Sequence, residues 1–528
     1  MLTLVRLNVR LSRRGALIAA VALAAALAAN ASAWTAAYPT QVSRDALATL
    51  LGESTGFRAL VGPPVAVNTI GGFIAWRLGV FALTALGVWG LLTTTRLLRG
   101  EEDVGRWEVV RSQPVTARSA TVAVLGAFAI DVALVWAVVT ATLLSLGPVY
   151  DIPATGSVAF TSALALGALA FASTGALAAQ IASTRRAAAG IAGGVVAAAM
   201  ALRVAADVGS AAWLRWTSPL GWLSEVRAYG GARPAVLLLY VAWIVVFVTL
   251  TLVVVARRDA GAGLLPSRDR AHGGTAMLRT PELASIRFAR GPAIAWIVGG
   301  AALALLLGSI ASTVRDTLGG SPIEEFVGPL GSFSSVLAYL SFAVFFLLAV
   351  VAALLLAGSI SGHWEEERTG RADTALASAV SRRRWLGARI GVAAATASVV
   401  VVVASVAAWA GVSLTGGGVS LSSLVVAGLA VLPVAFVYLG AGSAVYGIVP
   451  RAAVTIAYGL VVASFLLDVI GSLSSWPTWV LSLSPLHHLS YAPLAPVDVA
   501  RSLWLLLVAA VGVAVGVEAF ARRDIRSA

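Results

Sequence analysis

The sequence predicts an all-α protein that crosses a membrane about twelve times. Its 528 residues are 59% hydrophobic and only 12% charged, and the mean hydropathy is +0.91. Predominantly apolar runs of about 18 residues or more recur along the chain, and each is long enough to span a bilayer as a helix. The sequence lacks the alternating segments of about ten residues that are typical of a membrane β-barrel.

Twelve apolar runs give the expected transmembrane helices. They lie near residues 16–37, 73–95, 119–146, 157–182, 187–209, 234–256, 292–313, 333–361, 386–412, 420–448, 452–472 and 501–520.

The basic residues indicate how these helices are oriented. All 37 of them are arginine, because the chain contains no lysine. They gather in alternate connecting segments, and cytoplasmic segments are the ones enriched in basic residues. We therefore expect a multi-pass protein of the cell membrane with both termini in the cytoplasm. The net charge of +13 then results from this orientation and does not indicate a nucleic-acid partner.

Missing residue types exclude several kinds of chemistry. Without cysteine the chain has no disulfides and no thiolate metal sites. Without lysine it has no Walker A motif, so it does not bind ATP through a phosphate-binding loop. No hydrolase motif occurs, and we expect neither a catalytic site nor a metal site. His487 and His488 are adjacent without a nearby carboxylate cluster, which favours a structural role over metal binding.

The first apolar run allows two interpretations. Its basic start, apolar middle and small-residue end at Ala33 resemble a cleaved signal peptide. We favour an uncleaved helix, because the second half of the chain has a matching first span at 292–313. Residues 4–14 also place leucines on one face and arginines on the other, which predicts an amphipathic helix on the membrane surface.

The two halves of the chain repeat at an offset of 265 residues. Gly105 corresponds to Gly370, and the sequence ARRD at 256–259 returns at 521–524. Six spans per half give both halves the same orientation. We therefore expect two tandem six-helix repeats, related by a pseudo-twofold axis along the membrane normal, with a substrate path at their seam.

The expected domains follow from this repeat. Residues 1–256 form the first six-helix half and residues 291–528 form the second. Between them, residues 257–290 begin as a Gly-rich, polar and basic segment, which predicts a flexible cytoplasmic linker, and end in a helix that enters the membrane.

Each half carries an acidic segment after its second span: EEDVGRWEVVRSQP at 101–114 and EEERTGRADTALASAV at 365–380. Clustered carboxylates are too costly to leave in hydrocarbon, so each span should leave the membrane there. In the first segment we expect a turn at Gly105 and a short surface helix with Trp107 pointing inward. A solvated loop is the simpler explanation, but the repeated order of acidic residues, glycine and arginine favours a docking surface with exposed carboxylates.

The same pattern resembles the intracellular loop of ABC-2-type permeases, the membrane subunits of ATP-binding-cassette (ABC) exporters. It consists of an acidic cluster, a glycine, a further acidic residue, and then a proline, a β-branched pair and an arginine. The double-length form, with an SPL segment before the last span of each half, resembles the branch that exports polyketide antibiotics and other drugs. The second copy departs from the pattern, with Ala379 in place of Pro114 and Arg368 in place of Asp103.

The resemblance implies a division of labour between this chain and a partner. Two copies of a separate cytosolic ATPase would dock on loops 101–118 and 365–384. ATP and Mg²⁺ would act in that partner, and this chain would be a non-enzymatic permease, without a cofactor of its own, that moves amphipathic small molecules out through the lipid bilayer. The implied coupling residues are Glu101, Glu102, Gly105, Arg106 and Glu108 in the first loop, and Glu366, Glu367, Gly370, Arg371 and Asp373 in the second.

Four charged residues within the spans are candidates for the substrate path: Asp131, Arg203, Asp207 and Asp468. A charge at the centre of a span costs about 2.5–3.5 kcal/mol on insertion scales, so such residues usually face a partner or a wet cavity. Asp131 is equally compatible with a structural, hydrogen-bonded acid. Arg203 and Asp207 are four residues apart, which favours an ion pair within one helix over contact with a substrate.

The sequence leaves three other functions open. An ion-coupled secondary transporter also has twelve spans in two halves, although such proteins usually carry several carboxylates within the membrane. A membrane enzyme acting on lipid-linked substrates would use an acidic cluster, for which Asp316, Glu324 and Glu325 are the main candidates. An ABC-type exporter of lipids or lipid-linked glycans would share the present architecture.

Overall fold

The computed structural model consists of two compact units, residues 1–270 and 271–528. It describes residues 1–53, 58, 61–103, 105–107, 112, 114–208, 211–258, 263–264, 275–312, 335–377, 380–473 and 476–524. All regular secondary structure in these residues is helical, as predicted. Twelve of the helices are long and apolar enough to cross a membrane.

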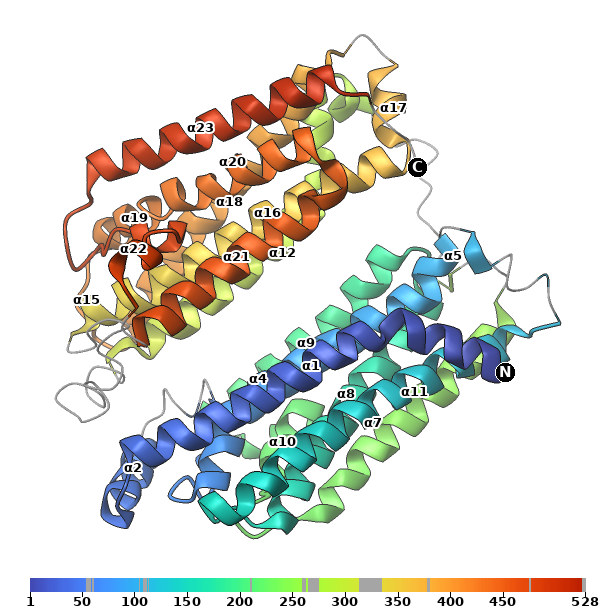
Figure 1. The fold of residues 1–528 in the computed structure, drawn as a ribbon, viewed down its shortest axis with the longest axis vertical. Helices are drawn as coiled ribbons and strands as arrows, with labels where there is room; N and C mark the ends of the chain where they lie inside the picture. The colour runs from blue at the N-terminus through green and yellow to red at the C-terminus, as the bar shows by residue number, and fades with distance from the viewer. Residues whose placement is uncertain are drawn as a thin grey trace. The chain divides into compact units, whose positions relative to one another are not determined.

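The first unit contains six of these long helices, which run side by side in Figure 1. Its elements are α1 (Leu2–Ala37), α2 (Gln41–Glu53), α4 (Ile70–Thr95), the π-helical turn η1 (Arg96–Gly100), α5 (Glu101–Asp103), α7 (Ala117–Tyr150), α8 (Ala154–Ile181), α9 (Arg185–Val208), η2 (Ala212–Thr217), α10 (Pro219–Val226), η3 (Pro234–Val236) and α11 (Leu237–Arg257).

The second unit contains the other six long helices. Its elements are η4 (Thr275–Leu278), α12 (Pro281–Ser309), α15 (Val336–Tyr339), the π-helical turn η6 (Leu340–Val344), α16 (Phe345–Arg368), α17 (Arg371–Leu376), α18 (Arg382–Leu414), α19 (Leu421–Leu429), α20 (Leu432–Ile448), α21 (Pro450–Leu473), α22 (Thr478–Leu481), η7 (Pro485–His488) and α23 (Val499–Arg522).

The expected surface helix at residues 4–14 is not a separate element. α1 runs without a break from Leu2 to Ala37. Within it, the Asn8 amide and the Ser12 hydroxyl donate to carbonyls four residues earlier, each at 2.9 Å. These polar side chains are therefore satisfied inside the helix, and nothing forces the chain to turn before the first span. The preference for an uncleaved first helix stays a prediction.

The same helix pairings occur inside both units. α1 packs along α7, α4 along α8, and α11 along α8. In the second unit α12 packs along α18, α16 along α20, and α23 along α20. This correspondence is compatible with the predicted duplication. The pseudo-twofold axis and the three predicted domain boundaries stay predictions, and most of the predicted linker lies outside the described residues.

Small residues bring α20 and α23 into close contact. A Cβ atom added to Gly440 would lie 2.6 Å from the carbonyl oxygen of Ala509, and one added to Gly516 would lie 2.3 Å from that of Ser443. Only glycine permits the two backbones to approach this closely. Within a bilayer the hydrophobic effect does not favour helix–helix over helix–lipid contacts, so close packing of this kind drives helices to associate. The end of α23 is thereby held against the end of α20.

Candidate functional site

The two acidic segments lie at corresponding helix ends. α4 continues through η1 and α5 to Asp103, and α16 ends at Arg368. A glycine then turns the chain in each unit, with a φ of +74° at Gly105 and +71° at Gly370. A left-handed conformation costs other residues about 1–2 kcal/mol, so glycine suits both positions. The turn predicted at Gly105 is present, and Gly370 turns the chain at the corresponding position.

In the first unit, Glu102 binds two buried arginines. Arg258, which follows α11, donates from Nη1 and Nη2 to the two Glu102 oxygens at 3.0 and 2.7 Å. Arg99 Nη1 donates to Glu102 Oε2 at 2.8 Å. The Arg258 Nε atom donates to Gln180 Oε1 at 2.7 Å. We call the Glu102–Arg258 pair the first latch, because it ties the end of the second span to the end of the sixth.

In the second unit, Glu367 occupies a similar position with different neighbours. Arg523, which follows α23, donates from Nη1 and Nη2 to the two Glu367 oxygens at 2.5 and 2.6 Å. The Tyr446 hydroxyl donates to Glu367 Oε2 at 2.7 Å. The Arg523 guanidinium also lies 4.9 Å from the ring centroid of Phe520. We call the Glu367–Arg523 pair the second latch.

The two latches correspond residue for residue at the offset of 265. The side chains of Glu102 and Glu367 are only 9% and 1% exposed. The expectation that both carboxylates are exposed is therefore wrong. A buried charge is stable only when it is paired and hydrogen-bonded, which is how both are found. These two residues therefore hold the loops to the helical bundle and do not form part of an open surface.

Other charged residues of the first loop lie nearer the surface. Arg106 is 68% exposed and donates to Glu101 at 2.6 Å. Trp107 packs inward against the cluster that contains Leu97 and Leu98, as predicted. Glu108 lies outside the described residues. The part of this loop that can meet a partner therefore includes the Arg106 side chain.

In the second loop, Glu366 is partly buried by its contact with Arg389, whose Nη2 donates to it at 2.5 Å. Arg371 and Asp373 lie on α17. The Arg371 side chain is exposed, and its Nε atom donates to the Thr369 hydroxyl at 3.0 Å. Asp373 lines an open hollow together with Asp524 and apolar side chains from the end of the loop. The coupling role of all these residues stays a prediction.

The four charged residues within the spans have local partners. Asp207 lies 3.0 Å from Arg203 Nε, which is the predicted ion pair within one helix, and 2.6 Å from Arg215 Nε. Asp468 accepts a hydrogen bond from the Ser484 hydroxyl and lies 3.3 Å from His487 Nδ1.

Asp131 is 2% exposed, and its carboxylate faces Ser12 of α1. Among the described residues, its Oδ2 atom has no hydrogen-bond partner. A role of Asp131, Arg203, Asp207 or Asp468 in a substrate path stays a prediction.

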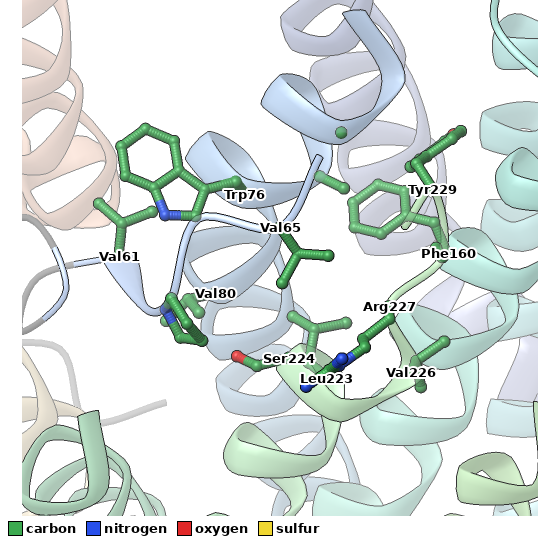
Figure 2. A pocket seen from close by; sticks show the side chains of 14 residues that line it. Val61, Val65, Trp76, Val80, Phe160, Leu223, Ser224, Val226, Arg227 and Tyr229 are labelled. Atoms are coloured by element: carbon green, nitrogen blue, oxygen red, sulfur yellow. The ribbon is translucent and has the colours of Figure 1, made fainter. Parts of the chain in front are cut away.

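A pocket opens at the other end of α4 from the first latch. It is an open cleft lined by Trp76 of α4, Phe160 of α8, Leu223 of α10 and the turn from Arg227 to Tyr229. Figure 2 shows these side chains around the space between α4 and α10.

Comparison with known proteins shows the family of this chain. It is 35% identical to the multidrug efflux system permease protein Rv1217c of Mycobacterium tuberculosis (strain ATCC 25618 / H37Rv), over 93% of this chain and 88% of that protein. Residues 278–521 also match the family model for the C-terminal domain of multidrug efflux system permease Rv1217c. The chain belongs to this permease family. The resemblance to exporter permeases is thereby confirmed, and with twelve potential spans the chain is a multi-pass membrane protein.

The latch arginines of this permease were not among the residues predicted for the site. Glu102 and Arg258 are 156 residues apart in the chain, so no local pattern connects them. One signal was present, because the repeated sequence ARRD contains Arg258 in its first copy and Arg523 in its second. A repeated arginine at the end of each sixth span, like a repeated carboxylate at the end of each second span, indicates a conserved contact between the two ends of each half.

Proposed function

We propose that the chain is the permease subunit of an ABC exporter that moves amphipathic small molecules, such as antibiotics, out of the cell. The observation that carries this proposal is the 35% identity to a multidrug efflux system permease over 93% of the chain. The chain contains no lysine and hence no Walker A motif. ATP must therefore be hydrolysed by another protein, for which we propose two copies of a separate cytosolic ATPase.

The predicted orientation places both loops on the side where such an ATPase is found. With both termini in the cytoplasm, the second and sixth spans of each half end on the cytoplasmic face, where the latches join them. The exposed Arg106 and Arg371 side chains, next to the turn glycines, are available to a docked partner. Loops 101–118 and 365–384 would each receive one ATPase subunit.

The latches suggest how a movement of these loops reaches the membrane. A loop that is pulled by the ATPase acts directly on the second span, which continues into it. Through the Glu102–Arg258 or Glu367–Arg523 contact it also acts on the end of the sixth span. In this scheme Glu102 and Glu367 are positioning residues, whereas Arg106 and Arg371 contact the partner. The spans themselves are solvated by membrane lipid.

Reversal of the two exposed loop charges tests the docking assignment. The variant Arg106→Glu with Arg371→Glu should lose the ATPase when the permease is purified from its own membranes. The new glutamates would repel the acidic ATPase surface that the two arginines bind in the native complex. The measurement is the ATPase activity, and the Walker A-containing polypeptide, that co-purify with the permease.

A matched control uses Arg257→Glu with Arg522→Glu. These exposed arginines also correspond at the offset of 265 and lie next to the latch arginines, but outside the loops. This variant should retain the ATPase. Retention of the ATPase by the loop variant, or equal loss in both variants, would contradict docking on the loops. Efflux driven by a cation gradient without nucleotide would instead support a secondary transporter.

A further inference from the structure

The pocket of the first unit has a built wall of aromatic and aliphatic side chains. Trp76 Nε1 donates to the carbonyl oxygen of Gly62 at 2.8 Å, which fixes the segment before α4 against the helix. Gly62 has a φ of +107°, a conformation that only glycine adopts readily. The wall is therefore formed before any ligand arrives, as is usual for small-molecule sites.

One polar group that lines the pocket, the Tyr229 hydroxyl, already has a hydrogen-bond partner. The Tyr229 hydroxyl donates to the Ser157 hydroxyl at 3.1 Å. Burial raises the pKa of the Tyr229 phenol to about 12. Tyr229 is therefore neutral at physiological pH and adds no charge to the pocket.

Arginines next to the pocket are neutralised by carboxylates. Arg203 and Arg215 share Asp207, at 3.0 and 2.6 Å. Arg233 lies 3.5 Å from Glu225, which follows Ser224 on α10. Within the described part of the chain, Arg227 forms no ion pair, although it lines the pocket. In Figure 2 its side chain extends from the turn after α10 toward Ser224.

The backbone of Arg227 is also unusual. It ends α10 in the left-handed conformation, with a φ of +47°. Glycine is the residue favoured at this position of a helix end, and another residue is strained there. Strained residues of this kind are concentrated at binding sites, where the side chain has a use that compensates the strain.

We propose that this pocket binds amphipathic small molecules that carry an anionic group. The apolar part of the ligand packs against Trp76, Phe160 and Leu223, and the anionic group accepts hydrogen bonds from the Arg227 guanidinium. The pocket lies at the opposite end of α4 from the latch, which is the outer end in the predicted orientation. Its role as a substrate site on the export path rests on the proposed function, whereas ligand binding itself does not.

Two matched fluorescent probes test this inference on the full chain in lipid nanodiscs without the ATPase. Dansyl-aminohexanoate is anionic and dansylcadaverine is cationic, and both carry the same aromatic group. The anionic probe should show saturable binding that is about tenfold tighter than that of the cationic probe, because only the former pairs with Arg227. Energy transfer from tryptophan to the bound dansyl group should fall in the Trp76→Phe variant.

The decisive variant is Arg227→Gly, which removes the charge and relieves the backbone strain, so folding is preserved. It should weaken binding of the anionic probe about tenfold and leave the cationic probe unchanged. Arg227→Lys should keep most of the affinity, and Arg257→Gln, at an exposed arginine at the other end of the unit, serves as a control that changes neither probe. The inference is overturned if Arg227→Gly binds the anionic probe as tightly as the native chain, or if the two probes bind equally.

This experiment separates the pocket from the ATPase assignment. Because no ATPase is present, loss of docking on the loops would not alter the titration. Equally, a pocket that fails to bind the anionic probe would leave ATPase docking as proposed.

Discussion

The first and second latches join the same pair of helix ends with different chemistry. In the first, one carboxylate lies between two guanidiniums, those of Arg99 and Arg258. In the second, one carboxylate binds a single guanidinium and a phenol, with aromatic rings of Tyr446 and Phe520 beside Arg523. The contact between the ends of the second and sixth spans is therefore common to both units, but its surroundings are not.

The corresponding positions explain the difference. Trp364 lies where the first unit has Arg99, and Tyr446 lies where it has Ile181. The first latch thus brings two guanidiniums to one carboxylate, with further hydrogen bonds from Arg99 to the Ala182 carbonyl and from Arg258 to Gln180. The second latch brings one guanidinium and one phenol to its carboxylate. We infer that both halves retain a contact between the ends of the second and sixth spans, whereas the charges around this contact differ.

Removal of the carboxylate should harm the first latch more than the second. Glu102→Ala removes the carboxylate that accepts hydrogen bonds from both Arg99 and Arg258, which should lower the free energy of unfolding by about 3–5 kcal/mol. Glu367→Ala leaves one arginine that keeps its aromatic contacts, and we expect a loss of about 2 kcal/mol. Unfolding of the purified permease in denaturant measures both, with Glu365→Ala, which removes a half-exposed partner of Arg368 in the second loop, as the control. Equal losses at the two latches would contradict the comparison.

Removal of the arginine should reverse this order. Arg523→Gln leaves the carboxylate of Glu367, which is 1% exposed, with only the Tyr446 hydroxyl, and should cost about 2–3 kcal/mol. Arg258→Gln leaves Glu102 paired with Arg99 and should cost about 1 kcal/mol. The same unfolding measurement applies. A larger loss for Arg258→Gln than for Arg523→Gln would mean that Arg99 does not neutralise Glu102.

Sequence reasoning reached the features that depend on local pattern. Twelve spans follow from runs of apolar residues, and the turn at Gly105 follows from a glycine beside an acidic segment that cannot remain in hydrocarbon. The ion pair of Arg203 with Asp207 was predictable because the two residues are four apart on one helix. Trp107 was correctly placed inward, since an aromatic side chain beside a membrane surface packs against apolar neighbours.

Features that depend on distant contacts were not reached. Glu102 and Glu367 look like solvated carboxylates in their own segments, and only the folded unit brings each to an arginine 156 residues later. The third partner of the Arg203–Asp207 pair, Arg215, belongs to a separate helical turn. Arg227 has a left-handed backbone conformation without being a glycine, so the sequence does not indicate it. The pocket that Arg227 lines was therefore not predicted either.

In the proposed mechanism the second latch transmits movement from the loop to the sixth span. The chain contains no cysteine, so Glu367→Cys with Arg523→Cys introduces only two thiols, and replacing both charges together avoids an unpaired buried ion. ATP-driven uptake of a fluorescent amphiphile into inverted membrane vesicles should be low in this double variant. It should recover when a short, reducible bis-thiosulfonate linker joins the two cysteines, and fall again on reduction. Transport that is unchanged by linking and by reduction, while the ATPase stays bound, would contradict the claim.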